Sequence, residues 1–226
     1  MSDPTIPGPV AGANLFASAA AGSPPSRRRF FAVSGAAAAL AVLGCSDNNG
    51  PGTSGGAVVT LPLQSDTDIL KFALFLELLE ADFYTKAVAS GVLSGGVSTL
   101  ATSVRNHETT HVDALQAALG SASFGENDVA FDFGSSFANQ TNFLATAQLL
   151  EETGVSAYLG ALPSIQSKAV RTTAGSIFTI EARHAAAFRA YNNASGGPVP
   201  AAFTMPMTPA EVVAAVQGTG FVTKGL

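Results

Sequence analysis

The sequence predicts an all-α protein built around an antiparallel four-helix bundle. Four long stretches repeat apolar residues at helical spacing, and Gly, Pro or Asn mark where they end. No stretch alternates apolar and polar residues clearly enough to predict a sheet. Four amphipathic helices bury their apolar faces by packing together as a bundle.

The four helices are expected over residues 67–90, 97–119, about 138–161 and about 165–192. Ser65, three residues before Asp68, is placed as the cap of the first helix, because a serine oxygen can accept a hydrogen bond from a free backbone N–H there. Gly120 ends the second helix, and Pro163 ends the third. The fourth helix runs into the sequence "NNASGGP", where glycine and proline stop it.

Two further segments surround these helices. A long connection over 120–137 joins the second and third helices, and its several Phe side chains are expected to pack on the bundle. A C-terminal extension covers 193–226. Within it, Thr208 and Glu211 form a capping box with a proline between them, which predicts a short helix to about residue 217.

Residues 1–45 are interpreted as an export signal and not as part of the fold. The run "SRRRFF" matches the twin-arginine pattern of bacterial export, and an Ala-rich apolar run follows it. That run ends in "VLGC", which resembles a lipobox and contains Cys45, the single cysteine of the sequence. Residues 46–60 are expected to be a flexible linker to the bundle, 61–192. We therefore expect export to the bacterial cell envelope or periplasm. Two alternatives stay open for Cys45: it is a lipidation site, or it is an incidental cysteine at the end of an ordinary cleaved signal.

Charge and cysteine content exclude several classes of function. The formal net charge is −5, and phosphate binding needs clustered Lys and Arg, so we expect no nucleic-acid partner. A membrane is expected to be reached only through the N-terminal lipid anchor. One cysteine excludes an intramolecular disulfide and a Cys₂His₂ or Cys₄ zinc site. A homodimer stays open, and the sequence identifies no partner protein.

Acidic and histidine side chains occupy inward positions on all four helices. Each shares its helical stripe with apolar residues, which face the core of a bundle. A carboxylate buried without a partner is very costly, so each needs a cation, a proton or hydrogen bonds. The first helix contributes Glu77 and the third contributes Glu151. The second and fourth helices each contribute a Glu-x-x-His pair, Glu108 with His111 and Glu181 with His184.

The spacing of these residues predicts a duplicated pair of helices. Glu151 follows Glu77 by 74 residues (151 − 77), and the second Glu-x-x-His pair follows the first by 73 (181 − 108 and 184 − 111). Tyr84 follows Glu77 by seven residues, as Tyr158 follows Glu151. We therefore expect two helix pairs related by a pseudo-twofold axis.

Residues 107–111, "HETTH", also match the HExxH pattern of zinc proteases. Such a protease needs a third ligand, and the sequence after His111, "VDALQAALG", offers none. His184 is already accounted for by the bundle. His107 lies one residue off the inward stripe and is expected to face solvent or a groove. A zinc protease is kept as a minor alternative.

The combined set of residues resembles the ligand set of the ferritin-like superfamily, whose bundles hold two iron or manganese ions between carboxylates. The segments "FALFLELLEADFYTKA", "HETTHVDALQAAL", "LLEETGVSAYLGAL" and "IEARHAAAFRAY" are most similar to the desiccation-related, stress-associated ferritin-like proteins. The resemblance covers about 61–192 and implies two Fe or Mn ions as cofactors. Four carboxylates would neutralise two divalent cations.

The resemblance also implies a role for each residue by position. Glu77 and Glu151 would each bind one metal, Glu108 and Glu181 would bridge both, and His111 and His184 would complete the two sites. Glu80, one turn from Glu77, and Glu152, beside Glu151, are alternate ligands, of which Glu80 is favoured. Tyr84 and Tyr158 either hydrogen-bond to ligand carboxylates or pack as core residues.

The resemblance implies a redox metalloprotein that reacts with peroxide or oxygen in stress protection, as a peroxidase, ferroxidase or catalase-like enzyme. No catalytic group beyond the metal ligands is evident. The alternative is a non-enzymatic structural or stress protein of the envelope with the same bundle. Iron storage is disfavoured, because the long connection 120–137, the extension 193–226 and a membrane tether all conflict with a closed shell.

Overall fold

The fold is given by a computed structural model that describes residues 57–226. The export signal over 1–45, the lipidation site Cys45 and most of the linker lie outside the described residues and stay predictions. In the described part of the chain, no helix combines the length and the apolar character that a membrane span requires.

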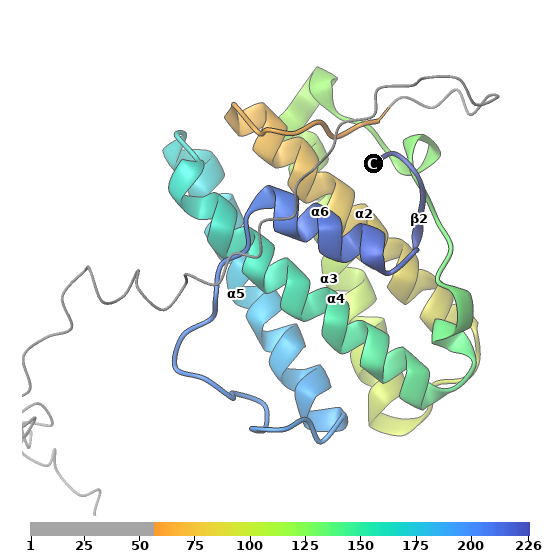
Figure 1. Cartoon of the computed structure of the whole chain (residues 1–226). Coiled ribbons are helices and arrows are strands. Elements are labelled where there is room, and N and C mark those ends of the chain that lie inside the picture. The colour runs from red at the N-terminus through yellow and green to blue at the C-terminus, as the bar shows by residue number, and fades with distance from the viewer. Residues whose placement is uncertain (1–56) are drawn as a thin grey trace, which may run out of the picture. The chain divides into compact units, whose positions relative to one another are not determined.

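Four long helices form a bundle of two helix pairs (Figure 1). α2 packs against α3 and α4 packs against α5, and these are the most extensive contacts between elements. The helices are α2 (Asp66–Ala89), α3 (Gly95–Leu119), α4 (Gln140–Ala161) and α5 (Lys168–Tyr191). This confirms the predicted all-α bundle.

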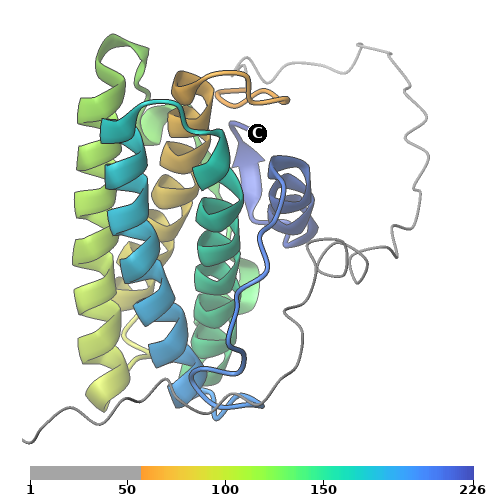
Figure 2. The same cartoon turned by 90° about the vertical axis from the view of Figure 1, so that its left-hand side faces the viewer.

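The long connection between α3 and α4 runs back along the bundle, so that α3 and α4 run in the same direction (Figure 2). Further contacts join α2 to α4 and α3 to α5. Each helix is therefore antiparallel to the neighbours that it contacts most. Short 3₁₀ turns interrupt the connection at Gly120–Ala122, Glu126–Asp128 and Gly134–Phe137, and a fourth, Leu162–Ser164, links α4 to α5.

Polar side chains fix where the helices start. Ser65 accepts a hydrogen bond from the backbone N–H of Asp68, as predicted. α4 and α5 start two and three residues later than expected, because Asn139 and Ser167 are the residues whose side chains cap them. Asp66 accepts a hydrogen bond from the backbone N–H of Ser167 at 2.7 Å, which ties the start of α2 to the start of α5.

The described residues include one small two-stranded sheet, which no pattern in the sequence revealed. β1 (Ala130–Phe131), in the long connection, pairs antiparallel with β2 (Val222–Lys224), near the C-terminus. Strands of this length are too short to show a period of two, and the partners lie far apart in the sequence. The sheet therefore depends on tertiary packing that no local pattern reveals.

The C-terminal extension packs against the bundle through α6 (Pro209–Gly218), the predicted short helix. Thr208 and Glu211 form the capping box that opens α6. Just before it, the backbone N–H of Met207 donates to the carbonyl oxygen of Ser156 on α4 at 3.0 Å. Gly160 permits this approach, because a Cβ there would lie 1.9 Å from the Met207 carbonyl oxygen.

The folded domain begins slightly earlier than the predicted boundary at residue 61. Val59, placed in the linker 46–60 by the sequence, is only 7% exposed and belongs to the hydrophobic core. The backbone N–H of Val58 donates to the carbonyl oxygen of Gly225 at 3.0 Å. The end of the expected linker is therefore held by the C-terminal segment.

Aromatic side chains of the long connection complete the core on one side of the bundle, as expected. Phe83 of α2 is fully buried, and its ring lies 5.2 Å from the rings of Phe133 and Phe137 and 5.5 Å from that of Phe143. Such ring pairs add to the stability gained from burying apolar area. They fix the connection onto α2 and α4.

We expect Phe83→Ala to lower the free energy of unfolding by about 3–5 kcal/mol, because it leaves a cavity among several aromatic rings. Urea unfolding followed by circular dichroism measures this change. Phe203→Ala is the control, since Phe203 is 81% exposed and its loss should change stability by about 0.5 kcal/mol or less. Equal effects of the two substitutions would contradict the packing described here.

Candidate metal centre

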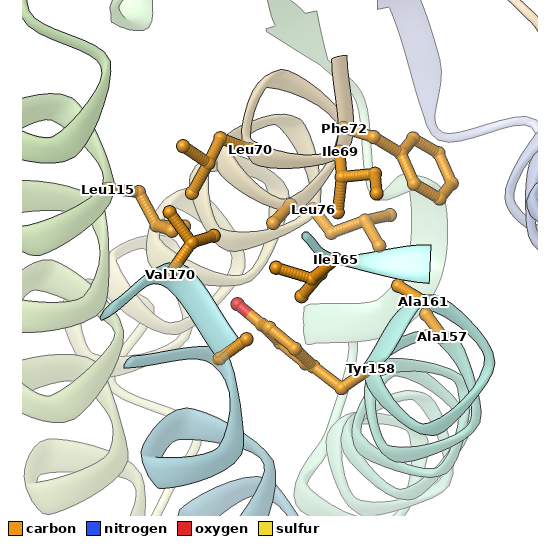
Figure 3. A pocket seen from close by; sticks show the side chains of 12 residues that line it. Ile69, Leu70, Phe72, Leu76, Leu115, Ala157, Tyr158, Ala161, Ile165 and Val170 are labelled. Atoms are coloured by element: carbon orange, nitrogen blue, oxygen red, sulfur yellow. The ribbon is translucent and has the colours of Figure 1, made fainter. Parts of the chain in front are cut away.

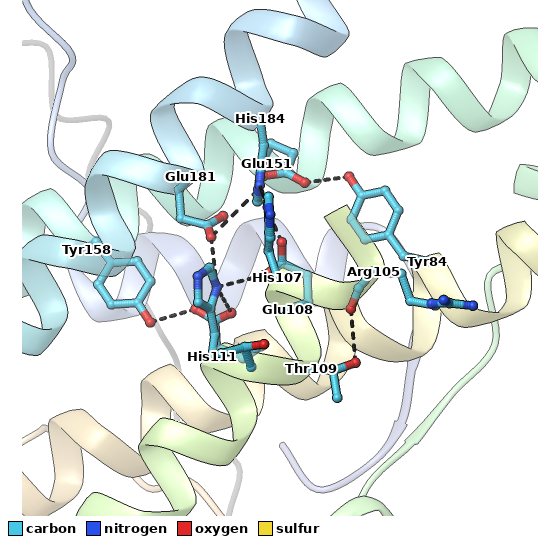
Figure 4. A network of polar contacts seen from close by, with 12 residues as sticks. Tyr84, Arg105, His107, Glu108, Thr109, His111, Glu151, Tyr158, Glu181 and His184 are labelled. Atoms are coloured by element: carbon cyan, nitrogen blue, oxygen red, sulfur yellow. Dashed lines mark hydrogen bonds and ion pairs between the residues drawn. The ribbon is translucent and has the colours of Figure 1, made fainter. Parts of the chain in front are cut away.

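The six residues proposed from the sequence as metal ligands come together between the four long helices, and Figure 4 labels all of them except Glu77. Each of the four long helices contributes to this centre. All six side chains are buried: Glu77 on α2, Glu108 and His111 on α3, Glu151 on α4, and Glu181 and His184 on α5.

The Glu-x-x-His spacing explains how each pair reaches the same point. Residues three apart lie side by side on one helix face, so Glu108 and His111 project together from α3. The same holds for Glu181 and His184 on α5. Buried apolar residues on both sides of each pair turn these faces inward.

The donor atoms form two sets, each compact enough to hold one metal ion. One set consists of Glu77, Glu108, His111 and Glu181, and the other consists of Glu108, Glu151, Glu181 and His184. Within each set, one donor atom per residue lies within 4.8 Å of all the others. The two sets share Glu108 and Glu181. Carboxylate oxygens with one imidazole nitrogen make up a donor set that divalent transition metals accept.

In each set an imidazole Nδ1 atom lies among carboxylates from several helices. Nδ1 of His111 is 3.0 Å from Glu108 and 3.1 Å from Glu77. Nδ1 of His184 is 3.1 Å from Glu108 and 3.2 Å from Glu151. The histidines thus face the carboxylates through the same ring nitrogen in both halves of the bundle.

Several buried polar atoms of the centre lack a hydrogen-bond partner. In the described part of the chain, all such side-chain atoms belong to this centre: Oε1 of Glu108, Oε2 of Glu151, both oxygens of Glu181 and Nδ1 of His184. Some of them lie within 3.1–3.2 Å of one another, yet without hydrogen-bond alignment. Unpaired buried polar groups are costly, so their convergence fits a shared cation as the missing partner.

The surroundings raise the pKa values of three carboxyl groups and both imidazoles of the centre: Glu77, Glu151, Glu181, His111 and His184. Burial raises the pKa of Glu77 to about 7, against the opposing effect of His111. Burial, together with the charge of Glu181, raises the pKa of Glu151 well above its ordinary value. Burial alone would lower the pKa values of the histidines, but the adjacent carboxylates raise them to about 12 for His111 and about 10 for His184. Without metal, the centre therefore retains protons.

Two tyrosine hydroxyls hold the outer carboxylates in a crosswise arrangement. Tyr84 of α2 donates to Oε1 of Glu151 on α4 at 2.5 Å, and Tyr158 of α4 donates to Oε1 of Glu77 on α2 at 2.6 Å (Figure 4). Of the two roles that the sequence left open, the structure thus shows hydrogen bonding to the carboxylates. Each hydroxyl fixes the orientation of a carboxylate on a helix of the other pair.

The two alternate ligands differ in position. Glu80 is buried beside the centre but belongs to neither donor set. Gly154 leaves room for it, because a Cβ there would lie 3.4 Å from Oε1 of Glu80 and 3.3 Å from Oε2 of Glu181. Glu152 lies outside the centre, where it accepts a hydrogen bond from Arg189 at 2.6 Å. Its placement as an alternate ligand is therefore corrected.

His107 faces solvent on one side, as expected, but it also makes a contact that the sequence did not reveal. Its Nδ1 lies 2.8 Å from Nε2 of His184. Neither donor set contains His107, so the two histidines of "HETTH" do not form a shared metal site. Burial and the charges of His184 and His111 lower the pKa of His107. The contact depends on the distance between α3 and α5, which a single helix pattern does not encode.

A small apolar cavity of about 20 Å³ lies beyond Tyr158, near the start of α5 (Figure 3). Its lining includes Ile69, Leu115, Ile165 and Val170. None of the donor residues lines it. Polar partners for an ordered water are scarce there, so the cavity is expected to be dry.

The fold and the two donor sets define a helical-bundle protein whose core can hold metal ions between carboxylates and imidazoles. The sequence model of the ferritin-like domain matches residues 65–194, more than half of the chain. The chain therefore belongs to the ferritin-like family. A comparison with curated proteins found no match.

We expect the metal-free protein to become less stable as pH rises from about 5 to about 8. Folding raises the pKa of Glu77 from 4.5 to about 7 and that of His184 from 6.5 to about 10, so the folded chain binds more protons than the unfolded chain. Stability from such groups is complete below the unfolded pKa and is lost as pH rises through the folded pKa.

Urea unfolding of the chelator-treated protein across this pH range tests the expectation. A free energy of unfolding that rises with pH would contradict it. Saturating metal should weaken the dependence or reverse it, because bound metal takes the place of the protons.

Proposed function

We propose that this chain is a di-metal ferritin-like protein that binds two Fe or Mn ions and reacts with peroxide or oxygen. The observation that carries the proposal is the cluster of unpartnered buried donor atoms, which converge from α3, α4 and α5. Two donor sets joined by two shared carboxylates match two cations in number and charge. A single structural cation would not need the second set.

The residues have distinct roles in this proposal. Glu77 with His111, and Glu151 with His184, each serve one metal position, while Glu108 and Glu181 serve both. The tyrosines orient the outer carboxylates through their hydrogen bonds. Surrounding apolar side chains exclude bulk water, which strengthens charge interactions inside the bundle.

When bound, a pair of Fe or Mn ions would supply two-electron redox chemistry with peroxide or oxygen. The chain itself would position the ions, balance their charge and limit the reaction to small molecules, because every donor residue is buried. The proposed role is that of a peroxidase, ferroxidase or catalase-like enzyme in stress protection.

Two further parts of the proposal rest on the sequence. The twin-arginine pattern supports export to the cell envelope or periplasm, since that route carries proteins already folded. The amino-acid sequences of the four helices support a place among the desiccation-related ferritin-like proteins. Cys45 would attach the mature protein to a membrane through a lipid.

A non-enzymatic structural role is the second candidate. It is favoured by the closure of the centre, since all six donor residues are at most 8% exposed. In that role the ions would mainly hold the four helices together. A zinc protease is disfavoured, because His107 contacts His184 instead of sharing a donor set with His111.

We expect the purified chain to bind about two Fe or Mn ions. The double variant Glu108→Ala/Glu181→Ala should lose both ions, because Glu108 and Glu181 each belong to both donor sets. Elemental analysis after dialysis measures the metal content. Glu152→Ala is the matched control, since Glu152 is an acidic residue of α4 outside the centre, and it should retain both ions. Two ions in the double variant would refute the assignment.

Addition of peroxide to the iron-loaded chain separates the two candidate functions. A rapid optical change that is absent from the double variant is expected for the redox role. Stable metal binding with no change of oxidation state would favour the structural role.

A further inference from the structure

The two ring nitrogens of His184 have different partners. Nδ1 faces Glu108 at 3.1 Å and Glu151 at 3.2 Å, on the side of the donor set. Nε2 lies 2.8 Å from Nδ1 of His107, and the two imidazole planes differ by only 9°. This geometry suits a hydrogen bond that lies close to both ring planes. His184 is thus held from both sides.

The other half of the bundle lacks this arrangement. The repeat offset of 73 residues places Ile180 at the position that corresponds to His107 (107 + 73). An isoleucine side chain can neither donate nor accept a hydrogen bond. Among the described residues, His111 has hydrogen bonds through Nδ1 only. The pseudo-twofold symmetry of the centre is therefore broken at this position.

We propose that His107 is a positioning residue that makes the two metal positions unequal, with tighter binding at the position of His184. The proposal rests on the proposed function, since it assumes that metal binds at the two donor sets. A histidine that binds metal through Nδ1 carries its proton on Nε2. His107 accepts that proton in a hydrogen bond, which fixes both the tautomer and the ring orientation of His184.

The contact also favours metal binding in energetic terms. A hydrogen bond to the far nitrogen of a ligating imidazole raises its basicity and reduces the ordering that metal binding requires. His111 gains no such support from a partner at Nε2. Loss of a supporting group of this kind typically lowers metal affinity by about 10–100-fold. We therefore expect sequential binding, with the His184 position filled first.

Two variants of His107 separate hydrogen bonding from packing. His107→Phe keeps a flat ring but removes the acceptor, whereas His107→Asn keeps an acceptor near the place of Nδ1. Both are made in the full-length chain. His107 is exposed on its outer side, so both variants should melt close to the wild-type temperature.

The Mn²⁺ affinity of each position is measured by titration calorimetry in two backgrounds. Glu77→Ala removes a donor that serves only the His111 position, and Glu151→Ala removes one that serves only the His184 position. We expect His107→Phe to weaken Mn²⁺ binding by about 10–100-fold in the Glu77→Ala background. In the Glu151→Ala background it should change affinity by about twofold or less, and His107→Asn should restore most of the loss.

An unchanged affinity in the Glu77→Ala background, or equal losses in both backgrounds, would overturn the positioning role. If the single-position backgrounds bind no Mn²⁺, the two stepwise constants of the otherwise wild-type chain decide. Then His107→Phe should weaken one step only, and a change in both steps or in neither would overturn the proposal.

Imidazole nitrogen NMR of the metal-free chain distinguishes failure of this inference from failure of the proposed function. The Nε2 proton of His184 should exchange slowly in the wild type and His107→Asn and rapidly in His107→Phe. A wild-type chain that binds no Mn²⁺ would refute the proposed function even if this proton is protected. Rapid exchange in the wild type would refute the contact with His107 itself.

Discussion

The structure depends above all on the burial of five glutamates and two histidines at the centre of an apolar bundle. Removing one carboxylate from water without compensation costs several kcal/mol, and here Glu77, Glu80, Glu108, Glu151 and Glu181 are removed together. The raised pKa values of Glu77, Glu151 and Glu181 indicate that bound protons compensate for part of this cost in the absence of cations. Two divalent cations would compensate more completely, because they neutralise four carboxylates and also satisfy the unpaired donor atoms.

The buried centre also requires helices from both helix pairs to pack together. Each donor set draws on three helices, so neither helix pair can form a complete set alone. The tyrosine hydroxyls strengthen this dependence, because each one on α2 or α4 orients a carboxylate on the other helix. Contacts that hold the pairs together therefore also hold the donor atoms in register. One of them is the hydrogen bond that the backbone N–H of Ser167, at the start of α5, donates to Asp66.

Much of the fold and the position of the centre could be predicted from the sequence, because both depend on helical periodicity. Glu108 and His111 share a face of α3 by their spacing alone, and the repeat predicted the matching pair on α5. The contact of His107 with His184 could not be predicted, since it depends on the separation of two helices. The pairing of β1 with β2 could not be predicted either, because each strand is too short to carry a pattern.

The departures from the repeat are as informative as the repeat itself. With the offset of 74 residues that relates Glu77 to Glu151, Glu80 corresponds to Gly154 (80 + 74). The structure places these two residues next to each other, with the carboxylate of Glu80 close to the space that a side chain at 154 would fill. A glutamate at both positions would compete for that space and add another buried charge. One half of the duplicated bundle thus supplies an acid, and the other half supplies the room for it. This complementarity makes the two halves chemically distinct while the main donor sets stay alike.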